Sequence, residues 1–404
     1  MHRRTMLTGL GAVAASGSAA RAAEKPGWMS PLLPDGTRDA AVMVRAPGKQ
    51  PLIQLTARPP NYETPIDAFR TPITPNDRFF VRYHLANIPT IADLKDWFLT
   101  IDGDAAERSI RLTPADLRKD FAQTEITAVC QCSGNRRGLL EPHVPGVQWG
   151  YGAVGNAVWR GVRLKDVLAK AGVKGDAKEV WLAGTDGPVM PATPAFQKSL
   201  PLRMAMNEDV LIATSMNGQP LPLLNGYPAR IVVPGWTATY WMKHLTSIQI
   251  SAKPQPGFWT QKAYRVPAGM FPVEQPFASQ QDNATWPITE MVVNSMIAAP
   301  LDGSKATRTG FTVRGMAWDR GHGIRTVEVS FDGGKTWKAA TLDKDLGKYA
   351  FRGFSLASGA LAPGPCVVSA RAVSNNGETQ AATLLKNPAG YHNNVPQTLT
   401  LTVA

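Results

Sequence analysis

The segment Cys132-Ser133-Gly134-Asn135-Arg136-Arg137 (CSGNRR) is the most informative stretch of this chain of 404 residues. It follows Glu125-Ile126-Thr127-Ala128-Val129-Cys130-Gln131, whose apolar and β-branched residues predict a strand that ends next to Cys132. A cysteine thiolate is a soft metal ligand, and guanidinium groups bind oxyanions through paired hydrogen bonds. The segment therefore predicts an enzyme site in which a metal and an anion lie close together.

The CSGNRR segment resembles the CAGNRR box of the sulfite oxidase family, in which the cysteine sulfur binds the molybdenum of a molybdopterin cofactor. By this resemblance Cys132 is the metal ligand. The resemblance covers roughly residues 60 to 404 and includes several further motifs in the order of the family. These motifs are Phe80-Val81-Arg82-Tyr83-His84, Gly184-Thr185-Asp186, Met216 to Pro222, Gly226 to Gly235, Trp259 and Tyr264.

Four residues carry the catalytic roles that this resemblance implies. Arg82 and Arg137 match the arginines that bind the substrate anion, and a planar guanidinium can donate two parallel hydrogen bonds to it. Tyr264 matches the tyrosine that lies over the metal, where its hydroxyl can bind an oxygen and its ring can exclude water. His84 shares a strand face with Arg82 and is either a proton carrier or a structural residue.

The cofactor contacts implied by the resemblance lie on four segments. Arg230 and Lys243 suit a phosphate group because both carry positive charge. At positions 225 and 241 the family usually has histidine. Asn225 keeps hydrogen-bonding capacity, whereas the side chain of Trp241 offers a single donor. The full set of expected contacts is Phe80, Val81, Arg82, Tyr83, His84, Asp186, Asn225, Arg230, Trp241, Met242 and Lys243.

The catalytic part of the chain, residues 61–252, has the pattern of an α+β domain. Helices are predicted at 112–120, which opens with the cap and proline Thr113-Pro114, and at 163–171, where apolar residues recur at helical spacing. Short apolar runs predict the strands, which are 79–84, 97–102, 125–130, 180–183, 230–233 and 247–250.

The C-terminal residues 286–404 have the alternating pattern of an immunoglobulin-like β-sandwich, and in the resembling family this domain forms the dimer. The hairpin Phe331 to Trp337 carries Asp-Gly-Gly at its turn. A proline-rich connector, 253–285, carries Tyr264 between the two domains, and a proline-rich arm, 23–60, precedes the first. The strands expected in the sandwich are 288–295, 310–318, 324–330, 337–342, 349–356 and 366–374.

The first 22 residues have the features of an export signal. Arg3-Arg4 is followed by an apolar stretch from Leu7 to Ala20 and by Ala20-Arg21-Ala22, which predicts a twin-arginine signal peptide over 1–22. No later apolar run approaches the length of about 18 to 20 residues that spans a bilayer. We therefore expect a periplasmic protein that is exported in the folded state.

Composition excludes several other classes. The formal net charge is +12, but the basic residues are dispersed, which disfavours nucleic-acid binding and would suit an acidic electron-transfer partner. Only three cysteines occur, too few for a disulfide framework. No Cys-x-x-Cys-His motif attaches a c-type haem, so we expect a separate c-type cytochrome as acceptor, either as a stable subunit or as a transient partner.

The function expected from these motifs is sulfite dehydrogenation at a molybdenum-molybdopterin centre, with sulfite as substrate and with electrons passed one at a time to that cytochrome. A molybdopterin-dependent reductase of methionine sulfoxide or another oxo-compound is the main alternative. An assimilatory nitrate reductase is a third, and a metal-free binding protein that uses the sandwich as an adhesive module is a fourth. The chain is expected to form a homodimer, or a heterodimer with the cytochrome.

Overall fold

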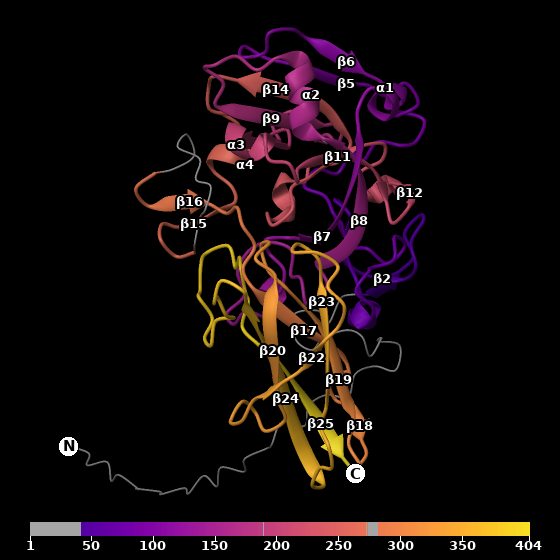
Figure 1. Cartoon of the computed structure of the whole chain (residues 1–404), viewed down its shortest axis with the longest axis vertical. Coiled ribbons are helices and arrows are strands. Elements are labelled where there is room, and N and C mark those ends of the chain that lie inside the picture. The colour runs from indigo at the N-terminus through magenta and orange to yellow at the C-terminus, as the bar shows by residue number, and fades with distance from the viewer. Residues whose placement is uncertain (1–41, 189, 272, 274–281) are drawn as a thin grey trace, which may run out of the picture.

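The computed structural model describes residues 42–188, 190–271, 273 and 282–404, and shows two parts stacked along one long axis (Figure 1). The predicted export signal, and the arm up to residue 41, lie outside the described residues. The sequence predicted an α+β first domain. The structure is mostly β, and the α-helices of the described residues are all short. They are α1 (Pro114–Lys119), α2 (Leu164–Ala171), α3 (Leu202–Ala205) and α4 (Phe258–Gln261).

The upper part in Figure 1 contains two five-stranded sheets and a small β-hairpin. The first sheet has the order β10 (Gln197–Pro201), β9 (Glu179–Gly184), β14 (Leu245–Ser251), β5 (Leu99–Asp102) and β6 (Ile110–Leu112). The second has the order β12 (Gln219–Pro220), β11 (Leu211–Met216), β8 (Val154–Arg163) and β7 (Gln123–Gln131), and β13 (Arg230–Val232) also pairs with β11. The hairpin is β15 (Arg265–Pro267) and β16 (Thr285–Pro287).

Helix α2 confirms the helical spacing seen in the sequence. Leu164, Val167, Leu168 and Ala171 are all fully buried, so one face of the helix packs into the core of this domain. Helix α1 begins with the expected cap, because the Thr113 hydroxyl accepts a hydrogen bond from the Asp116 backbone N–H. The described residues also contain four short stretches of 3-10 helix, which are η1 (Ile66–Arg70), η2 (Arg137–Leu139), η3 (Leu223–Asn225) and η4 (Ala238–Tyr240).

The arm is more ordered than its prolines suggest. From residue 42 onward it forms part of a four-stranded sheet, which lies beside the second sheet of the upper part and leads directly into the segment of Arg82 and His84. The strands of this sheet are β1 (Val42–Val44), β2 (Leu52–Thr56), β3 (Asn61–Glu63) and β4 (Val81–Arg82).

The lower part is a sandwich of two sheets. One has the order β17 (Asn294–Ala299), β19 (Thr312–Trp318), β23 (Arg352–Ala357) and β22 (Thr341–Leu342). The other has the order β18 (Lys305–Ala306), β25 (Gln397–Val403), β24 (Gly364–Ser374), β20 (Ile324–Ser330) and β21 (Lys338–Ala339). Buried apolar residues from both sheets form one cluster, which is what joins two sheets into a sandwich. The immunoglobulin-like assignment stays a prediction.

The sandwich is joined to the upper part at the end of β7. Trp318 donates its indole N–H to the Gln131 side-chain oxygen at 2.5 Å, and the Val129 N–H donates to the Tyr349 carbonyl at 2.9 Å. A buried apolar cluster crosses the junction, with Val129 and Phe69 on one side and Phe351 among the residues on the other. The strand that leads to Cys132 is therefore held by both parts of the chain.

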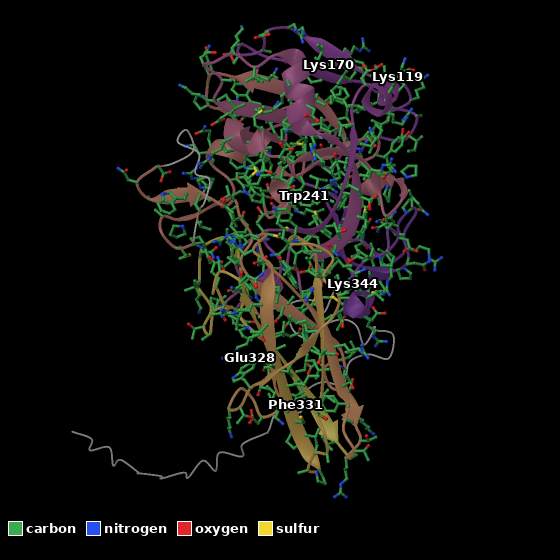
Figure 2. The ribbon with its side chains drawn as sticks, viewed as in Figure 1. Lys119, Lys170, Trp241, Glu328, Phe331 and Lys344 are labelled. Atoms are coloured by element: carbon green, nitrogen blue, oxygen red, sulfur yellow. The ribbon has the colours of Figure 1, made fainter. Side chains whose placement is uncertain are left out.

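Basic side chains lie on the surface of both parts. Lys119 in the upper part and Lys344 in the lower part are exposed, whereas Trp241 lies inside the upper part (Figure 2). The described residues contain no helix with the length and apolar character needed to cross a bilayer.

Candidate active site

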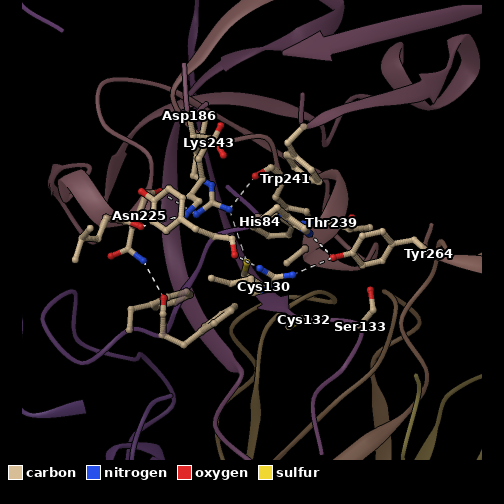
Figure 3. Close-up of a pocket in the computed structure, with 18 residues that line it drawn as sticks. His84, Cys130, Cys132, Ser133, Asp186, Asn225, Thr239, Trp241, Lys243 and Tyr264 are labelled. Carbon is tan, nitrogen blue, oxygen red and sulfur yellow. Dashed lines mark hydrogen bonds between the residues drawn. The ribbon is translucent and has the colours of Figure 1, made fainter. Parts of the chain in front are cut away.

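One cavity, with room of about 50 Å³, brings most of the predicted site residues together (Figure 3). It lies between the end of β7, the loop after β4, η3 and η4, and the segment that follows α4. Its polar lining is rich in nitrogen and contains a single carboxylate. The lining residues are Phe79, Phe80, Arg82, Tyr83, His84, Cys130, Cys132, Ser133, Asp186, Phe196, Leu224, Asn225, Arg230, Ala238, Thr239, Trp241, Lys243 and Tyr264.

Cys132 lies directly after β7 and borders the cavity with only 7% of its surface exposed. Its backbone is fixed on both sides, because its N–H donates to the Ala153 carbonyl and its carbonyl accepts from the Asn135 N–H. All three cysteines are free and buried. A buried, fixed thiol at the wall of a polar cavity has the placement that a metal-ligating cysteine requires.

Arg82, His84 and Tyr264 meet at one point of the cavity. The Tyr264 hydroxyl accepts a hydrogen bond from Arg82 Nη2 at 3.5 Å and is also hydrogen-bonded to His84 Nε2. Arg82 donates from Nη1 to the Tyr83 carbonyl and to the Asn61 side-chain oxygen. The dashed contacts in Figure 3 show His84 and Tyr264 facing each other across this point. Tyr264 has a left-handed backbone with φ of 59°, an uncommon conformation for a residue with a side chain.

Burial determines the protonation of the His84 imidazole and the Tyr264 hydroxyl. Burial lowers the pKa of His84 well below its ordinary value, and the nearby charges of Arg82, Lys243 and Lys198 act in the same direction. Burial raises the pKa of Tyr264 above its ordinary value, which Arg82 opposes. At neutral pH His84 is therefore uncharged and Tyr264 keeps its proton, so positive charge at this point comes from Arg82.

Arg137 is separated from Tyr264 by the ring of Tyr391. Its Nε donates to the Ala389 carbonyl at 2.7 Å and its Nη1 to the Val147 carbonyl at 3.2 Å. Its guanidinium lies 5.2 Å from the centre of the Tyr391 ring, which in turn stacks on Tyr264. Arg137 is absent from the cavity lining, so the described geometry places its guanidinium on backbone carbonyls and an aromatic ring. Its contact with the substrate stays a prediction.

A second group of charges lies at the other end of the cavity, where Figure 3 shows Asp186 and Lys243 close together. Arg230 is buried and donates to the carbonyls of Asn225 and Trp241. Burial lowers the pKa of Lys243 and raises that of Asp186, and the attraction between the two groups opposes both shifts. The buried Arg230 and the half-buried Lys243 lie here with a single carboxylate, and this excess of basic groups suits a bound phosphate.

Asn225 is held by a residue of the N-terminal arm. Lys49 is buried and donates to Asn225 Oδ1 at 2.5 Å and to the carbonyls of Asn76 and Phe79, while Asn225 Nδ2 donates to the Phe80 carbonyl. Both ends of the Asn225 amide are therefore used within the protein. A lysine in a proline-rich arm gives no sequence signal for this contact.

We expect Lys49→Met to lower the free energy of unfolding by about 1 to 3 kcal/mol, because two buried hydrogen bonds and one partly buried hydrogen bond lose their donor. Burial lowers the pKa of Lys49 from 10.5 to about 7, while Asp77 opposes the shift. The unfolded chain therefore binds more protons than the folded chain between those values, and Lys49 makes stability rise with pH in that range.

The variant should therefore show a flatter dependence of stability on pH above about pH 7, measured by urea unfolding at several pH values. Lys119→Met, which changes an exposed lysine, is the matched control. Equal slopes in the Lys49 variant and the unmodified protein would contradict the prediction.

Two predicted contacts have side chains outside the cavity. Val81 packs with Leu52 and Tyr83, and Met242 lies in the main core of the upper part, so both side chains are buried among apolar neighbours. Their contact with a cofactor stays a prediction. The other predicted cofactor contacts line the cavity, together with residues that the sequence analysis did not assign to the site. Those are Phe79, Cys130, Ser133, Phe196, Leu224, Ala238 and Thr239.

The donor set fits a molybdopterin cofactor. The Ser133 hydroxyl and Arg230 Nε are buried, line the cavity and have no hydrogen-bond partner within the described chain. Buried polar groups in proteins are normally hydrogen-bonded, so these two point to a polar group that the chain itself does not supply. Cys132 provides sulfur for a metal, and Arg230 with Lys243 provides charge for a phosphate.

Two family models match the chain. "Oxidoreductase molybdopterin binding domain" matches residues 85–259, and "Mo-co oxidoreductase dimerisation domain" matches residues 285–396. The first range contains Cys132 and most of the cavity, and the second contains the sandwich strands up to β24.

Curated relatives include mitochondrial sulfite oxidase of Macaca fascicularis, which is 37% identical over 306 residues, 74% of this chain and 54% of the relative. Sulfite oxidase of Arabidopsis thaliana is 32% identical over 331 residues, 78% of this chain and 81% of the relative. The chain thus spans about half the length of several relatives but most of the plant one.

Among solved structures, the sulfane dehydrogenase SoxCD from Paracoccus pantotrophus has a TM-score of 0.73 and 29% identity, with 85% of each chain covered. Sequence and structural similarity therefore agree with the motifs from which the site was built. The chain belongs to the sulfite oxidase family, and its first domain is a molybdopterin-binding domain whose cofactor is molybdenum-molybdopterin.

Proposed function

We propose that this protein is a sulfite dehydrogenase, which oxidises sulfite to sulfate and passes electrons to an external c-type cytochrome. The observation that carries the proposal is the meeting of Arg82, His84 and Tyr264 beside Cys132 in a buried, positively charged cavity. Sulfite and sulfate are small oxyanions, and such a site suits them. The sulfite oxidases among the relatives support the same substrate.

The protein side of the reaction follows from the contacts. Cys132 would hold the metal, and Arg230 and Lys243 would hold the charged end of the cofactor. When bound, the cofactor supplies oxygen-atom transfer and takes up two electrons. Arg82 binds the oxyanion by its charge, and Tyr264 Oη orients an oxygen of the substrate and keeps its own proton at neutral pH. Neutral His84 holds the Tyr264 hydroxyl, and the buried rings exclude bulk water.

Location and assembly are part of the proposal. The twin-arginine pattern at 1–22 supports export to the periplasm in the folded state. The match to the dimerisation domain supports a dimer of the chain, and a heterodimer with the cytochrome is the alternative assembly. The positive net charge would steer an acidic acceptor toward the protein.

The test is an assay of purified, cofactor-loaded protein for sulfite-dependent reduction of ferricyanide and cytochrome c, with molybdenum measured per chain. Turnover with about one molybdenum per chain supports the proposal. Molybdenum without sulfite oxidation, but with reduction of methionine sulfoxide, would instead assign the reductase alternative.

A second substrate class has its own support in the structural similarity to a sulfane dehydrogenase. In that reaction the oxidised atom is a sulfane sulfur rather than the sulfur of free sulfite. Thiosulfate and a polysulfide, assayed beside sulfite with the same acceptors, separate the two. Turnover of the sulfane compounds alone would replace the sulfite assignment.

A further inference from the structure

Strand β10 and the residue before it place two side chains next to His84 and Tyr264. Phe196, just before the strand, stacks on the His84 ring with 3.8 Å between the ring centres and 12° between their planes. Lys198, within the strand, is fully buried. In the sequence Lys198 looks like an ordinary surface lysine, because it stands beside Gln197 and Ser199. None of the roles described above uses it.

The ammonium group of Lys198 lies between two aromatic rings. Its Nζ is 4.5 Å from the centre of the Tyr240 ring and 5.4 Å from the centre of the Tyr264 ring. It donates to the Trp259 carbonyl at 2.8 Å, and so ties α4, which precedes Tyr264, to β10. Among the described residues no carboxylate forms an ion pair with Lys198. Burial is costly for an ammonium group without a counter-charge, so a structural role alone does not account for it.

A cation beside a tyrosine ring acts on the phenol. It is attracted to the electron-rich face of the ring, and it draws electron density away from the hydroxyl, which then donates a stronger hydrogen bond to an anion. Burial lowers the pKa of Lys198 to about 7, and the charge of Arg265 acts in the same direction. Lys198 thus faces the rings of Tyr240 and Tyr264 and the charge of Arg265. It also helps to lower the pKa of His84, while Glu290 and Glu179 act on Tyr240.

We propose that Lys198 is a positioning residue of the anion site, and that its buried ammonium group strengthens anion binding through the ring and hydroxyl of Tyr264. The proposal rests on the proposed oxyanion substrate. Lys198 does not line the cavity, so it acts through Tyr264, which does.

The kinetic test compares Lys198→Met, which keeps the length of the side chain without charge, with Lys198→Gln, which keeps an N–H donor without charge. In cofactor-loaded protein we expect the KM for sulfite to rise about tenfold in both variants. A change of that size matches the interaction energy between a desolvated cation and an aromatic ring. We expect kcat to change by less than about threefold, because the metal-binding residues are untouched. Lys119→Met is the control.

A second readout needs no turnover. The chain has eight tyrosines, and fluorine NMR of protein labelled with 3-fluorotyrosine reports the electron density at each ring. Tyr264→Phe and Tyr240→Phe assign the two relevant signals. In Lys198→Met both signals should shift while the other tyrosine signals stay in place. Sulfate titration of the Tyr264 signal should also need about ten times more sulfate than in the unmodified protein.

An unchanged KM in folded, molybdenum-loaded Lys198→Met, or an unshifted Tyr264 signal, would overturn the role of Lys198. A lower kcat with lower molybdenum content and an unchanged KM would also overturn it, because that pattern marks structure alone. Failure of the proposed function looks different. In that case the unmodified protein does not oxidise sulfite, while the fluorine signal of Tyr264 still reports whether the Lys198 charge acts on the ring.

Discussion

Replacement of Cys132 by serine should reduce sulfite turnover by at least about a thousandfold, a loss of roughly 4 kcal/mol of transition-state stabilisation. The hydroxyl that replaces the thiol is a harder and far less acidic donor, so the metal loses its only protein ligand in our proposal. The variant should still fold, because serine is nearly isosteric and the backbone hydrogen bonds of Cys132 remain. Turnover, molybdenum per chain and thermal unfolding are the three measurements.

Cys366→Ser is the matched control for this prediction, because Cys366 is a buried free cysteine in β24 of the sandwich, away from the cavity. It should keep its metal and its activity per molybdenum. Substantial turnover in the Cys132 variant would show that another group holds the metal, and the proposal for the site would fail. Cys130 would then be the first residue to test, since its side chain also lines the cavity.

Arg82→Gln should raise the KM for sulfite by about a hundredfold, a change of roughly 2.7 kcal/mol that matches the loss of a charged hydrogen-bond donor to an anion. His84 is uncharged at neutral pH and Tyr264 is neutral, so neither replaces the lost positive charge. Steady-state kinetics with sulfite should show a smaller effect on kcat than on KM, because the metal ligand is unchanged.

Arg137→Gln provides the comparison. Its guanidinium donates to the carbonyls of Ala389 and Val147, so its loss should lower the free energy of unfolding by about 1 to 3 kcal/mol and raise KM less than the Arg82 change does. Arg118→Gln, on the exposed side of α1, controls for the loss of one positive charge. A larger rise of KM in the Arg137 variant would mean that Arg137 leaves its carbonyl partners to bind the substrate.

Local chemistry explains which parts of the fold could be predicted. The helix at 164–171 depends on the spacing of apolar residues, and the hairpin at Asp332 depends on its turn residues, so a few neighbouring residues suffice to predict each. Both predictions are confirmed. The strand expected at 288–295 begins only at Asn294. Met291 is buried at the junction between the domains, and Ile288 is buried beside Tyr264, so neither belongs to a sheet. A run of buried apolar residues looks the same in the sequence whether or not it forms a strand.

The residues of the site also divide into those that the sequence could predict and those that it could not. Cys132, Arg82 and Tyr264 belong to motifs, so the sequence could name them even though 182 residues separate the two partners Arg82 and Tyr264. Lys49 and Lys198 carry no motif, and their burial depends on how the arm and β10 pack against residues far away in the chain. A single sequence contains no pattern that distinguishes such lysines from solvated ones.

The hydrogen bonds between the sandwich and the segment that follows β7 determine whether the two domains can be separated or exchanged. Arg136 donates to the carbonyls of Ser295 and Val395, and the Ser133 carbonyl accepts from the His392 N–H, so residues after 290 complete the loop of Cys132. The second domain is thus not a removable module for engineering. A chimera that exchanges it must bring along the matching CSGNRR loop, and a shortened chain that ends before the sandwich would expose the loop's buried polar groups to water.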